Sequence, residues 1–235
     1  VDRVAYDDMC SRMDAVAVVS QSCKEMLQGQ LPELADKLVY IPNMLDAVAI
    51  GQKAGNSLYT GDMLHIASVG RLAPEKHFEN IIPVAKALRD MSTDFVWHIV
   101  GDGSEQARLE SLIVENDLKD HVILEGSKTN PYPYMKYADL FVHPSYVESQ
   151  GLTVLEAMAL DVPCVVTKSL GPCEFIEDGV NGLLTEQSPE SLAEKVLAIL
   201  NDKKLYQHIK ENTKCPEQFG PERVMKQIEA LIDAG

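Results

Sequence analysis

The chain has 235 residues, of which 46% are apolar and 24% are charged, a composition typical of a globular protein with a sizeable core. Acidic residues outnumber basic ones by 36 to 21, and the net charge of −15 argues against a nucleic-acid partner, because binding a phosphate backbone requires a basic surface. No apolar run approaches the roughly 18 residues of a membrane span.

Two apolar stretches near the N-terminus predict buried strands. Residues 14–20 predict a strand followed by a helix that is capped at Ser20, and residues 37–41 predict a second strand. Residues 47–60 contain glycines and show little periodicity, so we expect them to form a linker.

From residue 64 onward, apolar runs alternate with amphipathic ones. The predicted strands are residues 64–69, 95–100, 121–124, 140–142, 164–167 and 182–184. The predicted helices are residues 78–91, 105–116, 134–137, 152–160 and 172–177. Strands that are buried on both faces and separated by helices indicate an α/β fold with a parallel sheet, whose ligands bind at the carboxyl ends of the strands.

The last third of the chain is predicted to be helical. Ser188 can cap a helix over residues 192–200, and a terminal helix is expected to start at Pro221 or Glu222 and to run to residue 233.

Two carboxylates flank the exit of the strand at residues 140–142. Glu148 and Glu156 are eight residues apart, so one continuous helix would place them about 80° apart and would not aim both at one ligand. If the helix begins near Gly151, the loop carboxylate and the helical one can converge on a ligand at the helix N-terminus. The free N–H groups there suit a phosphate, and carboxylates suit sugar hydroxyls. The pattern therefore fits a nucleotide-sugar, although two ordinary surface glutamates on an amphipathic helix would give the same spacing.

Two cations follow the first strand of the parallel sheet. Arg71 and Lys76 are five residues apart at a strand end, where they can converge on a diphosphate. The alternative is a pair of solvated surface cations.

Gly101 and Gly103 follow the next strand, but Gln106 occupies the third position of a dinucleotide fingerprint, which argues against NAD. A tight strand-to-helix turn is the simpler explanation of these glycines.

Five cysteines and six histidines show no spacing typical of a metal site, and no Asp-x-Asp triplet could bridge a metal to a diphosphate. We therefore expect no cofactor and a metal-independent site. The sequence begins without a leader segment, so we expect it to start in mid-chain. An odd number of cysteines in such a chain predicts a reduced, cytoplasmic protein.

Five segments in one order carry a family resemblance. They are SVGRLAPEK at residues 68–76, HIVGDGSE at 98–105, YADLFVHPS at 137–145, ESQGLTVLE at 148–156 and GPCEFIEDGVNGLL at 171–184. Together with their surroundings, over about residues 14–200, they resemble the nucleotide-sugar-binding C-terminal lobe of the family 4 (group 1) retaining glycosyltransferases.

This resemblance implies a domain organisation. The fold would be one lobe of the GT-B fold, a Rossmann-like doubly wound parallel sheet. Residues 1–46 would be a remnant of the N-terminal acceptor lobe, residues 47–60 a linker, residues 61–218 the nucleotide-sugar-binding domain and residues 219–235 the C-terminal helix.

The resemblance also implies roles for individual residues. Arg71 and Lys76 would neutralise the leaving nucleoside diphosphate, Glu148 would lie against the transferred sugar, and Glu156 would bind the ribose. Further donor contacts would come from Gly70, Gly101, Ser127, Lys128, Gly151 and Leu152. Two positions depart from the family pattern: His77 replaces a usual glycine and Gln150 replaces a usual phenylalanine.

The expected function is transfer of a sugar from a nucleotide-sugar donor to a glycan or lipid-linked acceptor bound by the absent lobe. We expect the donor to be UDP-linked. We expect this part alone to bind donor and to be inactive, and a full enzyme could associate peripherally with a membrane. Two alternatives remain: a non-catalytic nucleotide-binding or assembly module, and an NAD-dependent oxidoreductase with a similar sheet.

Overall fold

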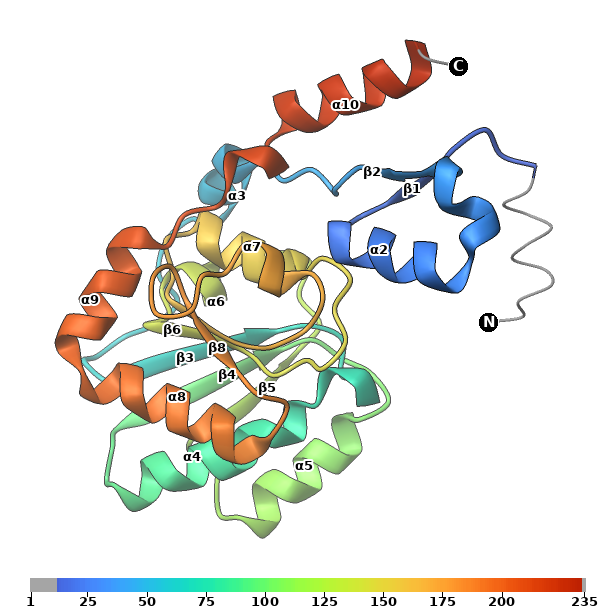
Figure 1. The fold of residues 1–235 in the computed structure, drawn as a ribbon. Coiled ribbons are helices and arrows are strands. Elements are labelled where there is room, and N and C mark those ends of the chain that lie inside the picture. The colour runs from blue at the N-terminus through green and yellow to red at the C-terminus, as the bar shows by residue number, and fades with distance from the viewer. Residues whose placement is uncertain (1–11, 234–235) are drawn as a thin grey trace.

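A six-stranded, fully parallel sheet forms the centre of the computed structural model, which describes residues 12–233 (Figure 1). The strand order is β5-β4-β3-β6-β7-β8. The strands are β3 (Leu64–Val69), β4 (Phe95–Val100), β5 (Val122–Gly126), β6 (Leu140–His143), β7 (Cys164–Thr167) and β8 (Leu183–Thr185). All six were predicted, and the α/β fold with a parallel sheet is confirmed.

Helices cover both faces of the sheet (Figure 1). One face carries α4 (Ile81–Asp90), α5 (Gln106–Glu115) and α8 (Pro189–Asn201), and the other carries α3 (Ala47–Lys53), α6 (Tyr132–Lys136) and α7 (Leu152–Ala159). Successive residues of a strand point to opposite faces, so Ile66 packs into the first layer and Ala67 into the second. The sheet is therefore buried on both sides, as its continuous apolar strands predict.

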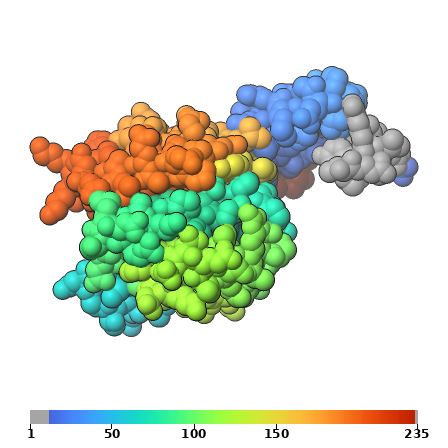
Figure 2. All heavy atoms as spheres, turned by 90° about the horizontal axis from the view of Figure 1, so that it is seen from below, coloured from blue at the N-terminus to red at the C-terminus, as the bar shows by residue number. Residues whose placement is uncertain are grey.

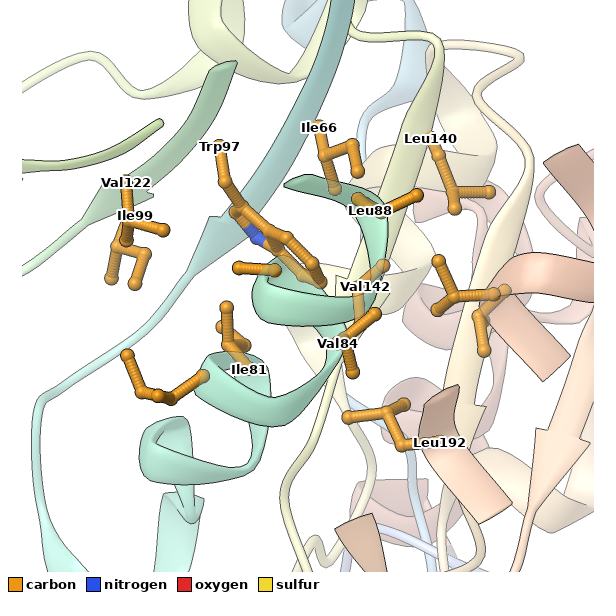
Figure 3. Packing of buried hydrophobic residues seen from close by; sticks show 14 of the residues in the cluster. Ile66, Ile81, Val84, Leu88, Trp97, Ile99, Val122, Leu140, Val142 and Leu192 are labelled. Atoms are coloured by element: carbon orange, nitrogen blue, oxygen red, sulfur yellow. The ribbon is translucent and has the colours of Figure 1, made fainter. Parts of the chain in front are cut away.

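The single tryptophan anchors the first of these layers (Figure 3). Trp97 is fully buried among Ile66, Val142 and Leu88, and its indole Nε1 donates a hydrogen bond of 3.1 Å to Ser68 Oγ. A buried indole needs such a partner for its N–H group. The contact also ties β4 to the centre of the sheet.

The strand order places a switch point between β3 and β6. The chain moves outward from β3 through β4 to β5 and then returns to the other side of β3 as β6. The connections that leave β3 and β6 therefore run in opposite directions, which opens a crevice at their carboxyl ends. The loops that carry Lys76 and Glu148 begin there.

The N-terminal region is a separate small layer. Strands β1 (Val16–Val18) and β2 (Leu38–Tyr40) pair in parallel, and α2 (Gln21–Gln30) and a 3₁₀ segment (Pro32–Lys37) connect them. Both strands and the helix were predicted, and Ser20 Oγ accepts a hydrogen bond of 3.2 Å from Cys23 N as the expected cap. Seen from below, this blue region lies to one side of the larger body (Figure 2).

Three elements differ from the sequence prediction. Helix α3 occupies part of the predicted linker, where only Ile50 of the helix is buried, so the periodic signal is weak. Helix α9 (Lys203–Asn212) lies in the last third, which was expected to be helical, but no separate helix was assigned there, because it buries Ile209 alone and depends on the Asp202 cap. The predicted helix at residues 172–177 is only a 3₁₀ turn, Pro172–Glu174.

At the other end of the described chain, α10 (Pro221–Asp233) projects away from the sheet and has Val224 as its one buried residue (Figure 1). Residues 1–11 and 234–235, including Cys10 and the outer ends of the two terminal segments, lie outside the described residues. The predicted division at residues 46, 60 and 218 stays a prediction. Between residues 12 and 233, no helix combines the length and the apolar character that a bilayer crossing needs.

Candidate functional site

A cavity of about 470 Å³, here called the main cleft, lies at the switch point. The exit of β3, the exit of β6 and the start of α7 line it, and Val19 and Asn43 of the N-terminal region form its remaining wall. Its predicted site residues are Gly70, Arg71, Lys76, Glu148, Gly151 and Leu152. Six of the ten predicted site residues thus meet around one cavity.

A second cavity of about 180 Å³, here called the side pocket, lies next to the main cleft. The two share Val69, Gly70 and Arg71, so they are adjacent at the exit of β3. The other predicted site residues of the side pocket are Gly101, Ser127 and Lys128. Nine of the ten predicted residues therefore line two adjacent cavities.

Glu148 is the most strongly held ionisable group of the main cleft. Lys76 Nζ donates to Glu148 Oε1 at 2.5 Å, and His143 Nε2 lies 2.6 Å from the same oxygen. Burial alone would raise the pKa of Glu148, but the hydrogen bonds from His143 and Lys76 outweigh it and lower the pKa to about 2. The carboxylate is therefore ionised at every physiological pH.

The start of α7 is a backbone feature of the same cavity. Gly151 precedes the helix with a φ of 83°, and a Cβ atom there would lie 2.9 Å from Pro172 Cγ, so the position requires glycine. The first-turn N–H groups of α7, at Leu152 and Thr153, have no acceptor within the helix and belong to residues that line the cleft. The predicted helix start near Gly151 is confirmed.

The two predicted cations reach the main cleft but are engaged by carboxylates. Arg71 Nη2 contacts Glu75 Oε1 at 2.6 Å and its side chain is 70% exposed, whereas the side chain of Lys76 is 19% exposed. Arg71 can therefore move toward an anion at little cost, and Lys76 must leave Glu148 to do so. His77, at the usual glycine position, takes a left-handed φ of 48°, and its ring stacks on Tyr146.

Glu156 is the one predicted residue that lines neither cavity. Its half-buried carboxylate accepts a hydrogen bond of 3.1 Å from the hydroxyl of Tyr132, next to Pro131 of the side pocket. Burial raises the pKa of Glu156, and the bond from Tyr132 opposes that shift. The structure thus places Glu148 in the main cleft and Glu156 against Tyr132 of α6, and the predicted convergence of the two carboxylates on one ligand stays a prediction. Its ribose role stays a prediction.

The side pocket depends on close backbone contacts. Gly101 has a φ of 147°, and a Cβ atom there would lie 1.9 Å from the carbonyl oxygen of Gly70. Gly101 therefore makes the tight turn that the sequence suggested and lets two strand ends approach each other. Lys128 lies 3.7 Å from Glu125 and over the ring of Tyr134.

His143 and Asn43 were not singled out as site residues, and Gln150 was named only as a departure from the family pattern. His143 was considered only as a metal ligand, although its position at the strand end, five residues before Glu148, could have marked it. Gln150 is buried and its amide pairs with Asn43: Gln150 Oε1 accepts from Asn43 N at 2.9 Å and Asn43 Nδ2 at 2.7 Å, and Gln150 Nε2 donates to Asn43 O at 3.2 Å. No local signal connects positions 107 residues apart.

Comparisons with known proteins agree with this geometry. Residues 56–215 match the model of the family described as glycosyl transferases group 1. An uncharacterized glycosyltransferase of Methanocaldococcus jannaschii is 32% identical over 195 residues, which are 77% of this chain and 54% of that protein. The N-acetyl-alpha-D-glucosaminyl L-malate synthase of Bacillus anthracis is 28% identical over 83% of this chain and 51% of its own length.

Among solved structures, Anabaena HepE in complex with UDP and glucose superposes with a TM-score of 0.87 at 23% identity, over 99% of this chain and 66% of HepE. This likeness establishes the GT-B type of fold for the part that the chain covers. The chain spans about half the length of the curated relatives described above.

Proposed function

Since the chain belongs to the group 1 glycosyltransferases, we propose that it is the donor-binding part of a retaining enzyme that transfers a sugar from a UDP-linked donor. The observation that carries this proposal is that Gly70 and Arg71 line both cavities, so the predicted phosphate-binding and nucleoside-binding residues lie in neighbouring cavities. HepE, which is similar in fold, binds UDP and glucose, and this supports a UDP-sugar as the donor.

The charges along these cavities sort the parts of such a donor. The diphosphate would lie between the first-turn amides of α7 and the cations Arg71 and Lys76, because free N–H groups and cations favour phosphate oxygens. The nucleoside would extend toward the side pocket, where Gly101, Ser127 and Lys128 line the wall. The sugar would lie beside Glu148, whose anionic carboxylate accepts hydroxyl hydrogen bonds.

The same arrangement accounts for the chemical step. As the bond between the anomeric carbon and the diphosphate breaks, negative charge grows on the diphosphate, where Arg71, Lys76 and the α7 amides stabilise it. Positive charge grows at the anomeric carbon, beside the carboxylate of Glu148, whose pKa is lowered to about 2 while His143 and Lys76 contact it. These residues supply the electrostatic role that a metal ion would otherwise fill, so we propose a metal-independent reaction.

The acceptor would be a glycan or lipid-linked molecule bound outside the described residues. We propose that this chain alone binds donor and transfers sugar slowly or not at all, since it matches only about half the length of these relatives. A non-catalytic nucleotide-binding module would use the same cavities and would show binding with no transfer in any assembly. A cytoplasmic location, and peripheral membrane association of a full enzyme, belong to the same proposal.

The test is a calorimetric titration of the full chain with UDP. Lys76→Gln is expected to weaken UDP binding roughly tenfold or more, because a hydrogen bond to a charged group is worth about 1.5–3 kcal/mol. Lys119→Gln serves as the matched control, since Lys119 is exposed and lines neither cavity. Unchanged affinity in the Lys76 variant, with a native circular dichroism spectrum, would remove Lys76 from the phosphate site.

A further inference from the structure

His143 and Lys76 both bind the same oxygen of Glu148. The two contacts to Oε1 are 2.6 and 2.5 Å long, whereas Oε2 makes no hydrogen bond within residues 12–233. One carboxylate oxygen is therefore fixed by the protein and the other is left for a ligand.

The two partners of Oε1 differ in mobility. Lys76 has a flexible side chain that is 19% exposed, and the proposed function requires it to reach the diphosphate. His143 is 2% exposed and ends strand β6, where its backbone pairs with Val166 of β7. The imidazole ring therefore cannot follow Lys76 when a donor binds.

Only one ring nitrogen of His143 is engaged. Its Nδ1 is buried and has no hydrogen-bond partner among residues 12–233. Nε2 is therefore the atom through which the ring holds Glu148, and it donates to Oε1 because an ionised carboxylate only accepts hydrogen bonds. Lys76 is the charged group that contacts Glu148, and the remaining charged groups of the main cleft are Arg71 and Glu75, which pair with each other.

We propose that His143 is a positioning residue: it holds Oε1 of Glu148 while Lys76 moves to the diphosphate, so that Oε2 stays aimed at the donor sugar. This inference rests on the proposed function. Without His143, the departure of Lys76 would leave a half-buried carboxylate with no donor among its described neighbours, and the carboxylate would turn or take up a proton.

The test compares UDP with two probes that add a sugar, UDP-glucose and UDP-N-acetylglucosamine, by calorimetry between pH 5 and pH 8. His143→Leu removes the donor. His143→Asn is polar but too short to reach Glu148, whereas the amide nitrogen of His143→Gln can take the place of Nε2. If the leucine variant does not fold, the asparagine and glutamine variants carry the comparison.

The wild-type chain should bind the preferred UDP-sugar more tightly than UDP by a ratio that is constant from pH 8 to pH 5, because Glu148 stays ionised over that range. In the leucine and asparagine variants, UDP affinity should fall to some extent, because the diphosphate draws Lys76 away from Glu148 with or without an attached sugar. The ratio of UDP-sugar to UDP affinity should fall about five- to tenfold, and it should fall further as the pH decreases, because burial then raises the pKa of Glu148. The glutamine variant should restore the ratio.

Two results would overturn the inference. One is a ratio of UDP-sugar affinity to UDP affinity that is unchanged and independent of pH in the leucine and asparagine variants. A ratio near one in the wild-type chain and in every variant counts as the same result. The other is an equal loss of UDP and UDP-sugar affinity, which would indicate a general structural role. Failure of the proposed function itself is distinct, since the wild-type chain would then not bind UDP at all.

Discussion

The N-terminal region and the six-stranded domain differ in how they are stabilised. The domain encloses two large apolar layers, with Trp97 and Phe141 fully buried. The N-terminal region has two short strands, and its own cluster consists of Leu31 and Leu34 with two partly buried neighbours. A two-stranded sheet is marginally stable by itself.

Side-chain hydrogen bonds join the two regions. Gln150 pairs with Asn43, and the carboxylate of Glu174 accepts hydrogen bonds of 2.6 Å from Ser22 N and Ser22 Oγ and of 3.2 Å from Gln21 N at the start of α2. The region that forms one wall of the main cleft is thus attached by side chains from the loops after β6 and β7. Its attachment and the shape of the cleft depend on the same residues.

The largest expected difference concerns a matched pair of substitutions, Leu140→Ala and Leu34→Ala. Leu140 is fully buried in the first layer of the domain, so its truncation should lower the free energy of unfolding by about 3–5 kcal/mol. The measurement is chemical denaturation followed by the fluorescence of Trp97, the single tryptophan of the chain, which lies in the same layer.

Leu34→Ala removes the same atoms from the N-terminal cluster and should leave the Trp97 transition nearly unchanged. It should instead increase the hydrogen exchange of amides in β1, α2 and β2. Equal shifts of the Trp97 transition in both variants would show that the two regions unfold as one cooperative unit.

A smaller effect is expected for Gln150→Leu. The substitution removes three neutral hydrogen bonds to Asn43, each worth roughly 0.5–1.5 kcal/mol, so the N-terminal region should open more easily by about 2 kcal/mol. Hydrogen exchange of the β2 amides measures this opening. A double-mutant cycle with Asn43→Ala should give a coupling of about 1 kcal/mol for the side-chain bond, and purely additive effects would contradict the pairing.

The smallest effect is expected for Glu174→Ala, which removes an acceptor from the first turn of α2. The carboxylate is half-buried, and a lost cap of this kind costs about 1 kcal/mol. Exchange of the Gln21 and Ser22 amides should increase. Glu177→Ala is the control, because Glu177 is exposed in the same loop and its carboxylate contacts no part of α2. Equal effects of the two variants would show that α2 is held in another way.

Much of the fold could be predicted because its signals are local. Each strand of the sheet is a short apolar run bounded by polar or turn residues, and Ser20 and Ser188 are caps that are read from adjacent positions. Helices α3 and α9 were not assigned as separate helices because each buries one residue, Ile50 and Ile209 respectively, and a single apolar contact produces no periodicity.

The site was predictable to the extent that its residues follow strand ends. Lys76, Glu148 and Gly151 were expected together because parallel strands end at one edge of the sheet. The direction of a side chain, however, depends on residues that are distant in the sequence. Glu156 contacts Tyr132, and Lys76 is paired with Glu148 instead of being unpaired in the cleft. Such partners lie 24 and 72 residues apart, and only packing decides between them.

The pairing of β3 with β6 joins two half-sheets through the narrow register of Ile66 with Leu140 and Ala67 with Phe141. Arg71 and Lys76 belong to one half, whereas Glu148 and the head of α7 belong to the other. Any molecule that fills the main cleft therefore contacts both half-sheets and helps to hold them together. If the chain is cut in the loop between β5 and β6, the main cleft forms only when the two pieces reassemble. Ligand binding would then measure that reassembly directly.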